Sequence, residues 1–332
     1  MSIVRSAAAF ITSAVIMSGA IGASTASAAD LPVKAVPIAS PWVFDVHGYF
    51  DVTFASTRVT GGGFLLYPTN SVLAQVEVGL SLDIYKDSTG FINKVSVFGG
   101  IWNELYEHAP PAGVRHWQEM DWWAGINVGF AKYWTLSAQS LNFVFPNAAP
   151  GAGTAYNYNF ALAFDDSFLG LPVVFNPYVS LFYNDKGGST VVLGKRSDAY
   201  RVTFGMNPTI NFAKQFGVPL TIWFPTSVVV APTDFWNRND GSPQTLSCGL
   251  TNNLPCSAGN VGFYTTGLQT KYSLEGPIPK RLGSWYVKAG VQYYHIVNDS
   301  LLAAQQFNFA TTNFAGAKSD IVLVNGGFGF SY

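Results

Sequence analysis

Charged residues are scarce in this chain, and long apolar runs are absent from most of it. Of its 332 residues only 11% are charged, and the formal net charge is −1. So weak a charge gives no sign of a polyanion-binding surface, and nucleic acid is not an expected partner. Beyond the N-terminal segment, no stretch holds the roughly 18 consecutive apolar residues of a membrane helix. The mean hydropathy is nevertheless positive, so the apolar residues must be arranged in another pattern.

Recognisable catalytic and metal-binding motifs are also missing. None of the four histidines stands in a nucleophile arrangement. His116 and Asp121 form the one pairing that could serve a rim protease, which needs Asp and His together at the outer mouth of a barrel. One loop carries metal-capable side chains whose spacing fits no zinc motif: Glu104, Glu107, His108 and His116. We therefore expect no enzyme activity, no cofactor and no metal site.

The first 28 residues are typical of a secretory signal peptide. Arg5 precedes an apolar run over residues 7–21, and a small-residue cleavage site ends at Ala28. The alternative, an uncleaved membrane anchor, requires about 20 apolar residues, more than this run provides. We expect cleavage after Ala28 and a short periplasmic leader over residues 29–41.

In the last thirteen residues, apolar side chains alternate with small or polar ones instead of forming a long apolar run. Apolar and aromatic side chains share one face of this segment, and small or polar ones share the other. An aromatic last residue with apolar partners at steps of two resembles the terminal signature of bacterial outer-membrane proteins. The apolar face consists of Val322, Val324, Phe328, Phe330 and Tyr332.

The same alternation recurs along the chain and predicts twelve strands. Long connections follow the odd-numbered strands and short ones follow the even-numbered strands, like the extracellular loops and periplasmic turns of outer-membrane barrels. Both ends of the barrel sequence then lie on the periplasmic side. The expected strands are 42–55, 72–85, 92–103, 120–132, 133–145, 154–164, 172–184, 199–212, 218–230, 261–274, 284–296 and 320–332.

Prolines interrupt this pattern in the later strands. The segments 172–184 and 218–230 are the weakest of the twelve. Proline cannot donate to a ladder, and a closed barrel has no edge strand where its presence is harmless. Bulges or shifted boundaries are therefore expected at Pro177, Pro208, Pro219 and Pro225.

Residues 42–332 are thus predicted to form an all-β, transmembrane, antiparallel up-and-down β-barrel of about 12 strands. Such a barrel pairs every backbone group between strands and crosses lipid without any hydropathy peak. The alternative is a soluble β-sandwich or jelly roll whose aromatic face is its core. Aromatic residues make up 15% of the chain, and burying so many on strands this long would require an oversized core.

The inward face carries the candidate pore-lining residues, and their charges segregate along the chain. We expect a narrow pore with an acidic wall facing a basic one, whose transverse field orients dipolar solutes. The alternative is that the same charges pair across the lumen and brace a closed barrel. The early strands contribute Asp45, His47, Asp51, Glu77, Asp83 and Asp121; the late strands contribute Arg201, Lys271 and Lys288.

Two further features of the lumen and loops are candidates for function. Phe98, Trp102 and Trp123 point inward and could stack on sugars or bases, although filler side chains or a register slip of one residue would explain them as well.

Cys248 and Cys256 lie in the long segment 231–260, where a disulfide would contribute about 2 to 3 kcal/mol. That segment either folds inward as a constriction or stays outside as a lid or receptor surface.

Taken as a whole, residues 42–332 resemble small bacterial outer-membrane porins, such as the twelve-stranded nucleoside-channel and related porin families. The opening of the mature chain, residues 29–34, is similar to the N-termini of several α-proteobacterial outer-membrane proteins. This implies passive diffusion of small hydrophilic solutes across the outer membrane of a Gram-negative bacterium. The implied partners are outer-membrane lipid, these solutes and the outer-membrane insertion machinery. The alternatives are a sealed adhesin or structural barrel and, less favoured, an outer-membrane hydrolase; the oligomeric state stays open.

Overall fold

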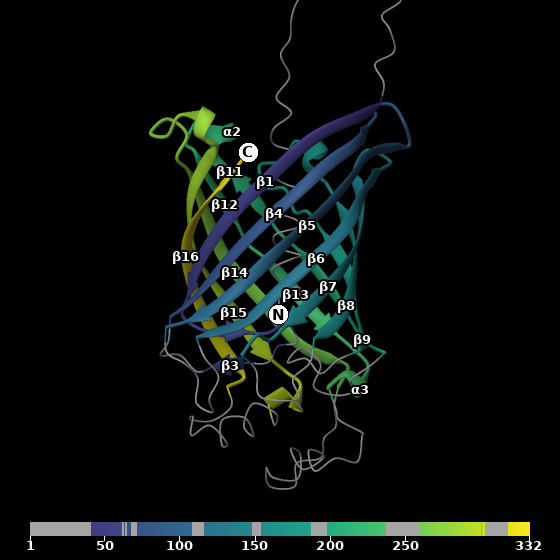
Figure 1. Cartoon of the computed structure of the whole chain (residues 1–332), viewed down its shortest axis with the longest axis vertical. Helices are drawn as coiled ribbons and strands as arrows, with labels where there is room; N and C mark the ends of the chain where they lie inside the picture. The colour runs from purple at the N-terminus through teal and green to yellow at the C-terminus, as the bar shows by residue number, and fades with distance from the viewer. Residues whose placement is uncertain are drawn as a thin grey trace, which may run out of the picture.

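The chain forms a closed barrel of twelve antiparallel strands, tilted across the barrel wall (Figure 1). The computed structural model describes residues 41–61, 63, 65–67, 72–107, 116–147, 154–186, 198–236, 259–299, 301–302 and 318–332. Two of the twelve strands are each split into two segments. The barrel strands are β1 (Trp42–Ala55), β4 (Leu73–Lys86), β5 (Ile92–Tyr106), β6 (Trp117–Phe130), β7 (Trp134–Val144), β8 (Ala155–Phe164), β9 (Tyr178–Lys186), β10 (Ala199–Met206) with β11 (Thr209–Asn211), β12 (Leu220–Trp223) with β13 (Thr226–Val230), β14 (Val261–Ser273), β15 (Ser284–Ile296) and β16 (Asp320–Ser331).

The C-terminal strand closes the barrel, as its alternation predicted. β16 pairs with β15 on one side and with β1 on the other. At the very end, the backbone N–H groups of Gly48 and Tyr332 donate to each other's carbonyl oxygens, at 3.2 and 3.0 Å. Closure leaves no strand edge with unpaired backbone groups, which is the condition for a β-structure to span lipid.

The prolines shift the strand boundaries in the way the sequence indicated. The ladder breaks at Pro208, between β10 and β11, and at Pro225, between β12 and β13. The seventh strand starts at Tyr178, directly after Pro177, so the expected start at residue 172 was wrong. The prolines still act as acceptors: the carbonyl of Pro208 receives the N–H of Phe224 at 2.8 Å, and that of Pro177 receives the N–H of Phe164 at 3.0 Å. Only the missing donor interrupts each strand.

The expected division between an outer apolar face and an inner polar face is confirmed. Large apolar side chains of the predicted outer face, such as Trp42, Leu80 and Phe160, are exposed on the barrel exterior. Polar side chains such as Gln75, Asn157 and Thr203 are buried on the opposite face. A closed barrel with an even number of strands and an apolar outer band is typical of proteins whose exterior contacts lipid. This architecture places the protein in the bacterial outer membrane.

Two adjacent residues in the middle of β4 provide a test of these faces. Leu80 points outward and is 54% exposed, whereas Ser81 is opposite His47 and Phe98 on the inner face. We expect Leu80→Arg to destabilise the barrel by about 2 to 4 kcal/mol, because it puts a charge near the bilayer midplane. Ser81→Arg should cost much less. Guanidinium unfolding of both variants in lipid vesicles measures the difference, and equal losses would contradict the assignment of faces.

Short turns gather at one end of the barrel, together with β16's C-terminal end and α2 (Phe212–Phe216) (Figure 1). This is the periplasmic end by the loop-length rule. β6 and β7 are joined through Ala131 and Lys132, both at positive φ, which fits the very short turn expected near Lys132. In another turn the N–H and hydroxyl of Thr89 donate to Asp87, and these bonds lower the pKa of that carboxyl. Among the described residues, no helix is long and apolar enough to cross a membrane.

Long connections leave the opposite, extracellular end, and two of them place short elements there. β2 (Arg58–Val59) pairs with β3 (Leu65–Tyr67) in a small separate hairpin. α3 (Thr233–Trp236) follows β13. Figure 1 shows β3 and α3 at this end, opposite α2. Both elements turn their side chains toward the lumen, where they meet the candidate site.

Candidate functional site in the barrel lumen

The hairpin of β2 and β3 folds into the extracellular half of the lumen. Its residues Arg58, Val59, Thr60 and Leu65 are all buried. Its turn includes Gly63 at φ +84°, and a Cβ on Gly63 would lie 2.5 Å from the Phe263 ring of β14. The hairpin thus starts from β1 and reaches a strand three places away around the barrel, and only glycine fits the close contact. It narrows the lumen from within.

Arg58 holds the hairpin against the barrel wall. Its guanidinium forms ion pairs with Glu104 of β5 and Glu119 of β6, and both carboxylates are buried. Its Cζ lies 5.4 Å from the centre of the Trp102 ring. Glu104 also accepts hydrogen bonds of 2.9 Å from Gln75 Nε2 and from the Tyr106 hydroxyl. Since each additional donor satisfies a buried carboxylate oxygen, this network fixes the position of Arg58.

The constriction at Arg58 is acidic overall. Asp121 of β6 is fully buried and adds a third carboxyl group next to Glu119. Three carboxyl groups then face one guanidinium. Of this set, only Asp121 was predicted to line the pore. The prediction that Glu104 lies in a loop was wrong, since it is buried within β5 and pairs with Arg58. The available signal for Arg58 was the apolar content of the connection around it together with its three successive glycines, which is unusual for a solvated loop.

A second polar cluster lies in the middle of the lumen. Asp51 forms an ion pair with Lys288 and accepts a hydrogen bond of 2.7 Å from the Tyr286 hydroxyl. Lys271 Nζ lies 4.0 Å from the centre of the Tyr286 ring. The Tyr49 hydroxyl donates to Glu77 at 2.6 Å. Residues from the first and the late strands meet here because barrel closure brings β15 within two strands of β1.

This neighbourhood corrects part of the expected charge separation. Lys288 does not face Asp51 across the lumen, since the two pair directly along the wall. Lys271 lies on the adjacent strand β14, over Tyr286. Of the three basic residues, only Arg201 of β10 is on the wall opposite β1 and β4, five strands from β1 in one direction and seven in the other. Of the predicted basic wall, therefore, only Arg201 lies across the lumen from the acidic groups near Arg58.

A third cluster lies toward the periplasmic end. Asp83 is buried and accepts from Lys86 and Lys94, each at 3.0 Å, and from His47 at 3.3 Å. Lys86 also pairs with Asp45 at 2.7 Å. The two lysines were missing from the predicted lining residues. Lys94 is four residues before Phe98 on β5 and therefore lies on the same face of the strand, so the alternation predicts an inward side chain for it.

The three inward aromatic residues cover gaps in the wall. A Cβ on Gly100 would lie 2.6 Å from the Trp123 ring, and one on Gly125 would lie 2.5 Å from the Phe98 ring. Trp102 packs beneath Arg58. An aromatic ring lying over a cross-strand glycine is a recurring way to stabilise barrels. Stacking of a solute on Phe98, Trp102 or Trp123 stays a prediction.

Apolar side chains fill the extracellular mouth of the barrel. Phe235 and Trp236 of α3 are buried there, with ring centres 4.6 Å apart in an edge-to-face contact. The Trp236 ring lies against Gly262, where a Cβ would be 2.5 Å away. The first part of the connection 231–260 therefore turns inward. Cys248, Cys256 and His108 lie outside the described residues.

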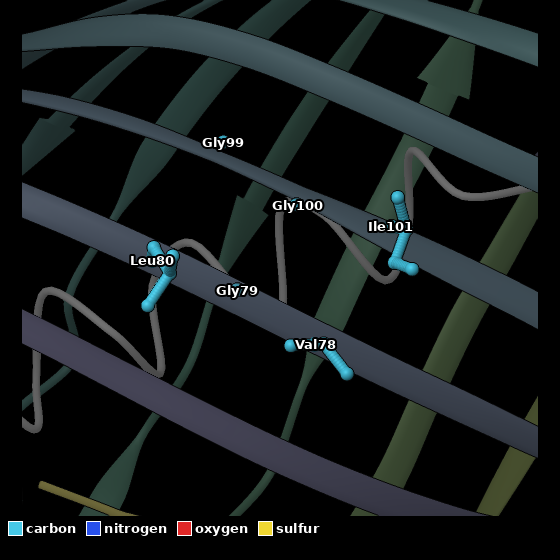
Figure 2. Close-up of a pocket in the computed structure, with 6 residues that line it drawn as sticks. All are labelled: Val78, Gly79, Leu80, Gly99, Gly100 and Ile101. Atoms are coloured by element: carbon cyan, nitrogen blue, oxygen red, sulfur yellow. The ribbon is translucent and has the colours of Figure 1, made fainter.

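One groove belongs to the exterior of the barrel and not to the lumen. Val78, Leu80 and Ile101 border it, and Gly79, Gly99 and Gly100 leave its floor bare of side chains (Figure 2). The three apolar side chains are exposed on the outer face. Its lining is apolar and its position faces lipid, so this groove is suited to an acyl chain and not to a hydrophilic solute.

The described part of the chain holds no metal-binding group, but an Asp–His pair does form at its extracellular rim, where His295 Nδ1 lies 2.8 Å from Asp320 Oδ1 and the Ser319 hydroxyl donates to the same carboxylate at 2.6 Å. No group of three or more His, Cys, Asp or Glu side chains among the described residues could hold a metal ion. His116 Nδ1 contacts the backbone oxygen of Tyr106 at 2.9 Å, and no described contact joins it to Asp121. The Asp–His pair considered for a rim protease is not formed.

Comparisons with known proteins do not assign the chain to a family. No protein-family model and no curated protein matches it in sequence. It is similar to the solved structure of an outer-membrane channel from Pseudomonas putida F1, with 8% identity and a TM-score of 0.42 over 89% of this chain and 97% of that chain. It is also similar to the NanC porin, with 10% identity and a TM-score of 0.41 over 85% of this chain and 98% of that chain. A third similar structure is LpxR from Salmonella typhimurium, with 11% identity and a TM-score of 0.40 over 85% of this chain and 99% of that chain. The likeness at these values concerns the barrel architecture alone.

Proposed function

We propose that this protein is a porin-like channel for the passive diffusion of small hydrophilic solutes across the outer membrane. The observation that carries the proposal is the solvent exposure of charged side chains on the inner face. Asp45, His47 and Lys86 are 54%, 39% and 38% exposed near the periplasmic ends of β1 and β4. Charged groups retain water when they line an aqueous path, because removing their hydration is costly. The periplasmic half of the lumen is then a wet vestibule.

Selection takes place at the hairpin of β2 and β3. A solute that enters from outside meets the acidic groups around Arg58 on one wall and Arg201 on the other. Low-dielectric walls concentrate the field between them, so dipolar solutes are oriented as they pass. The clusters of Asp51, in the middle of the lumen, and of Asp83, toward the periplasmic end, balance their own charges and contribute less to this field.

The second candidate is a sealed barrel that acts as an adhesin or structural protein through its extracellular loops. The apolar side chains that fill the mouth favour it, because Trp102, Trp123, Trp236 and Phe263 are all buried there. A dry plug at this level blocks solutes whatever the polarity below it. An outer-membrane hydrolase is less favoured, because the Asp–His pair at the rim, His295 and Asp320, is exposed and borders no described pocket.

Single-channel recording separates the two candidates. The mature chain is refolded, inserted into a planar bilayer and checked for insertion by protease protection. Discrete conductance steps support the channel. A correctly inserted barrel without conductance supports the sealed barrel and refutes passive diffusion.

The charge balance around Asp83 gives a prediction about ion selectivity. Two lysines, Lys86 and Lys94, face two carboxylates, Asp45 and Asp83. Asp83→Asn leaves one uncompensated positive charge, so the reversal potential in a salt gradient should shift toward anion preference. The double change Asp83→Asn with Lys94→Met restores the balance and should restore the wild-type value. A shift that persists in the double variant would mean that charge in this cluster does not control selectivity.

A further inference from the structure

Arg201 on β10 is a buried charge without a counter-charge. Its side chain is 0% exposed, and its Nε, Nη1 and Nη2 atoms have no hydrogen-bond partner among the described residues. Its Cζ lies 5.0 Å from the centre of the Phe182 ring on the neighbouring strand β9. An aromatic face offsets part of the charge, but no described carboxylate pairs with the guanidinium. Such an arrangement is strongly unfavourable unless an anion from outside completes it.

The neighbouring strands present hydrogen-bond acceptors toward the same part of the lumen. Asn184 of β9 donates its amide to Asn157 at 2.7 Å, and its own Oδ1 has no partner. Asn159 of β8 lies opposite Phe182 in the strand register, and its Oδ1 is also without a partner. Both asparagines are buried. Unpartnered donors on Arg201 and unpartnered acceptors on the two asparagines are therefore on three consecutive strands, with Phe182 between Arg201 and Asn159 in the register.

The spacing of these groups suits one small solute. β8, β9 and β10 are consecutive strands of the barrel. Neighbouring strands lie about 4.8 Å apart, so the backbones of Asn159 and Arg201 are separated by about 10 Å. Phe182 stands between the two positions, and the guanidinium lies over its ring, which brings the charge nearer to Asn159. A molecule the size of a four-carbon hydroxy acid reaches from the guanidinium to the asparagine oxygens.

We propose that Arg201, Asn159 and Asn184 form a binding site for a small hydroxylated organic anion that the channel carries, an inference that rests on the proposed function. The guanidinium fork pairs with two oxygens of a carboxylate at once. The asparagine oxygens accept hydrogen bonds from hydroxyl groups of the solute, which an unsubstituted anion does not provide. Phosphate offers similar oxygens to Arg201 and no hydroxyl-bearing carbon chain, so the two anions can be told apart.

Direct binding tests the site whether or not the barrel conducts. Malate, succinate and inorganic phosphate are titrated separately into the folded barrel in detergent, and binding is followed by tryptophan fluorescence and thermal shift. We expect saturable malate binding, with succinate weaker because it lacks the hydroxyl group. Arg201→Met should weaken malate binding about tenfold or more, the usual effect of losing hydrogen bonds to a charged partner. Arg281→Met is the matched control, because it removes the same charge from an exposed residue of the periplasmic turn.

The outcomes separate this inference from the channel itself. Equal malate affinity in Arg201→Met and the wild type overturns the site, even if the protein conducts. Binding of phosphate through Arg201 without binding of malate overturns the assignment to a hydroxylated organic anion. Malate binding that depends on Arg201 in a barrel without conductance supports the binding site and refutes transport through it.

Discussion

Arg58→Met is expected to destabilise the folded barrel by about 3 to 5 kcal/mol, the usual cost of removing one partner from a buried ion pair. Glu104 and Glu119 are both buried, and Arg58 is the cation that each of them contacts. Without it, two carboxylates remain in a region where water does not replace the lost partner. Guanidinium unfolding in detergent micelles, followed by tryptophan fluorescence, measures the loss.

Two matched variants show whether the loss comes from unpaired charge. Combining Arg58→Met with Glu104→Gln and Glu119→Gln removes both signs together, so most of the stability should return. Arg201→Met removes an equally buried guanidinium that has no counter-charge, and it should leave stability unchanged or raise it. If the triple variant is as unstable as Arg58→Met, packing of the side chain and not charge pairing holds the hairpin.

The second large effect concerns the extracellular mouth. Replacing Phe235 and Trp236 together by alanine is expected to raise single-channel conductance several-fold. The two buried rings belong to α3, a four-residue helix that follows β13, and they pack against each other. Alanine at both positions removes the contact with Gly262 and lets the segment leave the mouth.

The barrel itself should survive this double change. Deleting large buried aromatics costs about 3 to 5 kcal/mol each in a rigid core, but a short element at the rim can undock without unfolding the strands. Resistance to unfolding by detergent on unheated gels should therefore match the wild type. Tyr158→Ala on the lipid face removes a comparable ring outside the lumen and should leave conductance unchanged. Unaltered conductance in the Phe235 and Trp236 variant would show that the mouth is not the limiting constriction.

If both results are obtained, the resistance of the proposed channel lies in the extracellular half of the lumen. The hairpin is fixed by charge pairing at Arg58, and α3 is fixed by apolar contact at Trp236. The periplasmic half has no inward-folded element among the described residues, and its charged groups are partly exposed. If the protein conducts as proposed, we therefore expect passage to be controlled near the outside.

Strand number, strand limits and the two faces could be predicted from the sequence because they are local properties. Alternation with a period of two determines which side chains share a face, and this does not depend on which strands pair with one another. The boundaries at Trp42 and Ala55 agree with the structure, and so do those at Ser284 and Ile296. The predicted third strand ended three residues too early and the fourth began three residues too late, since β5 runs to Tyr106 and β6 starts at Trp117. The largest errors lie at Pro177, Pro208 and Pro225, where a missing N–H donor shortens or splits a strand by an amount that depends on its partners.

The sequence by itself determined that this chain forms a closed barrel with an apolar outside and a polar inside, since one repeated local pattern specifies both. It could not determine which inward charges meet. Asp51 and Lys288 are 237 residues apart and become neighbours only when β16 closes the ring. Nor could it show that Arg58 leaves the wall to join Glu104 and Glu119, or that Arg201 stays without a partner. Those contacts depend on strand register, on closure and on the path of inward-folded connections, and only the tertiary structure decided them.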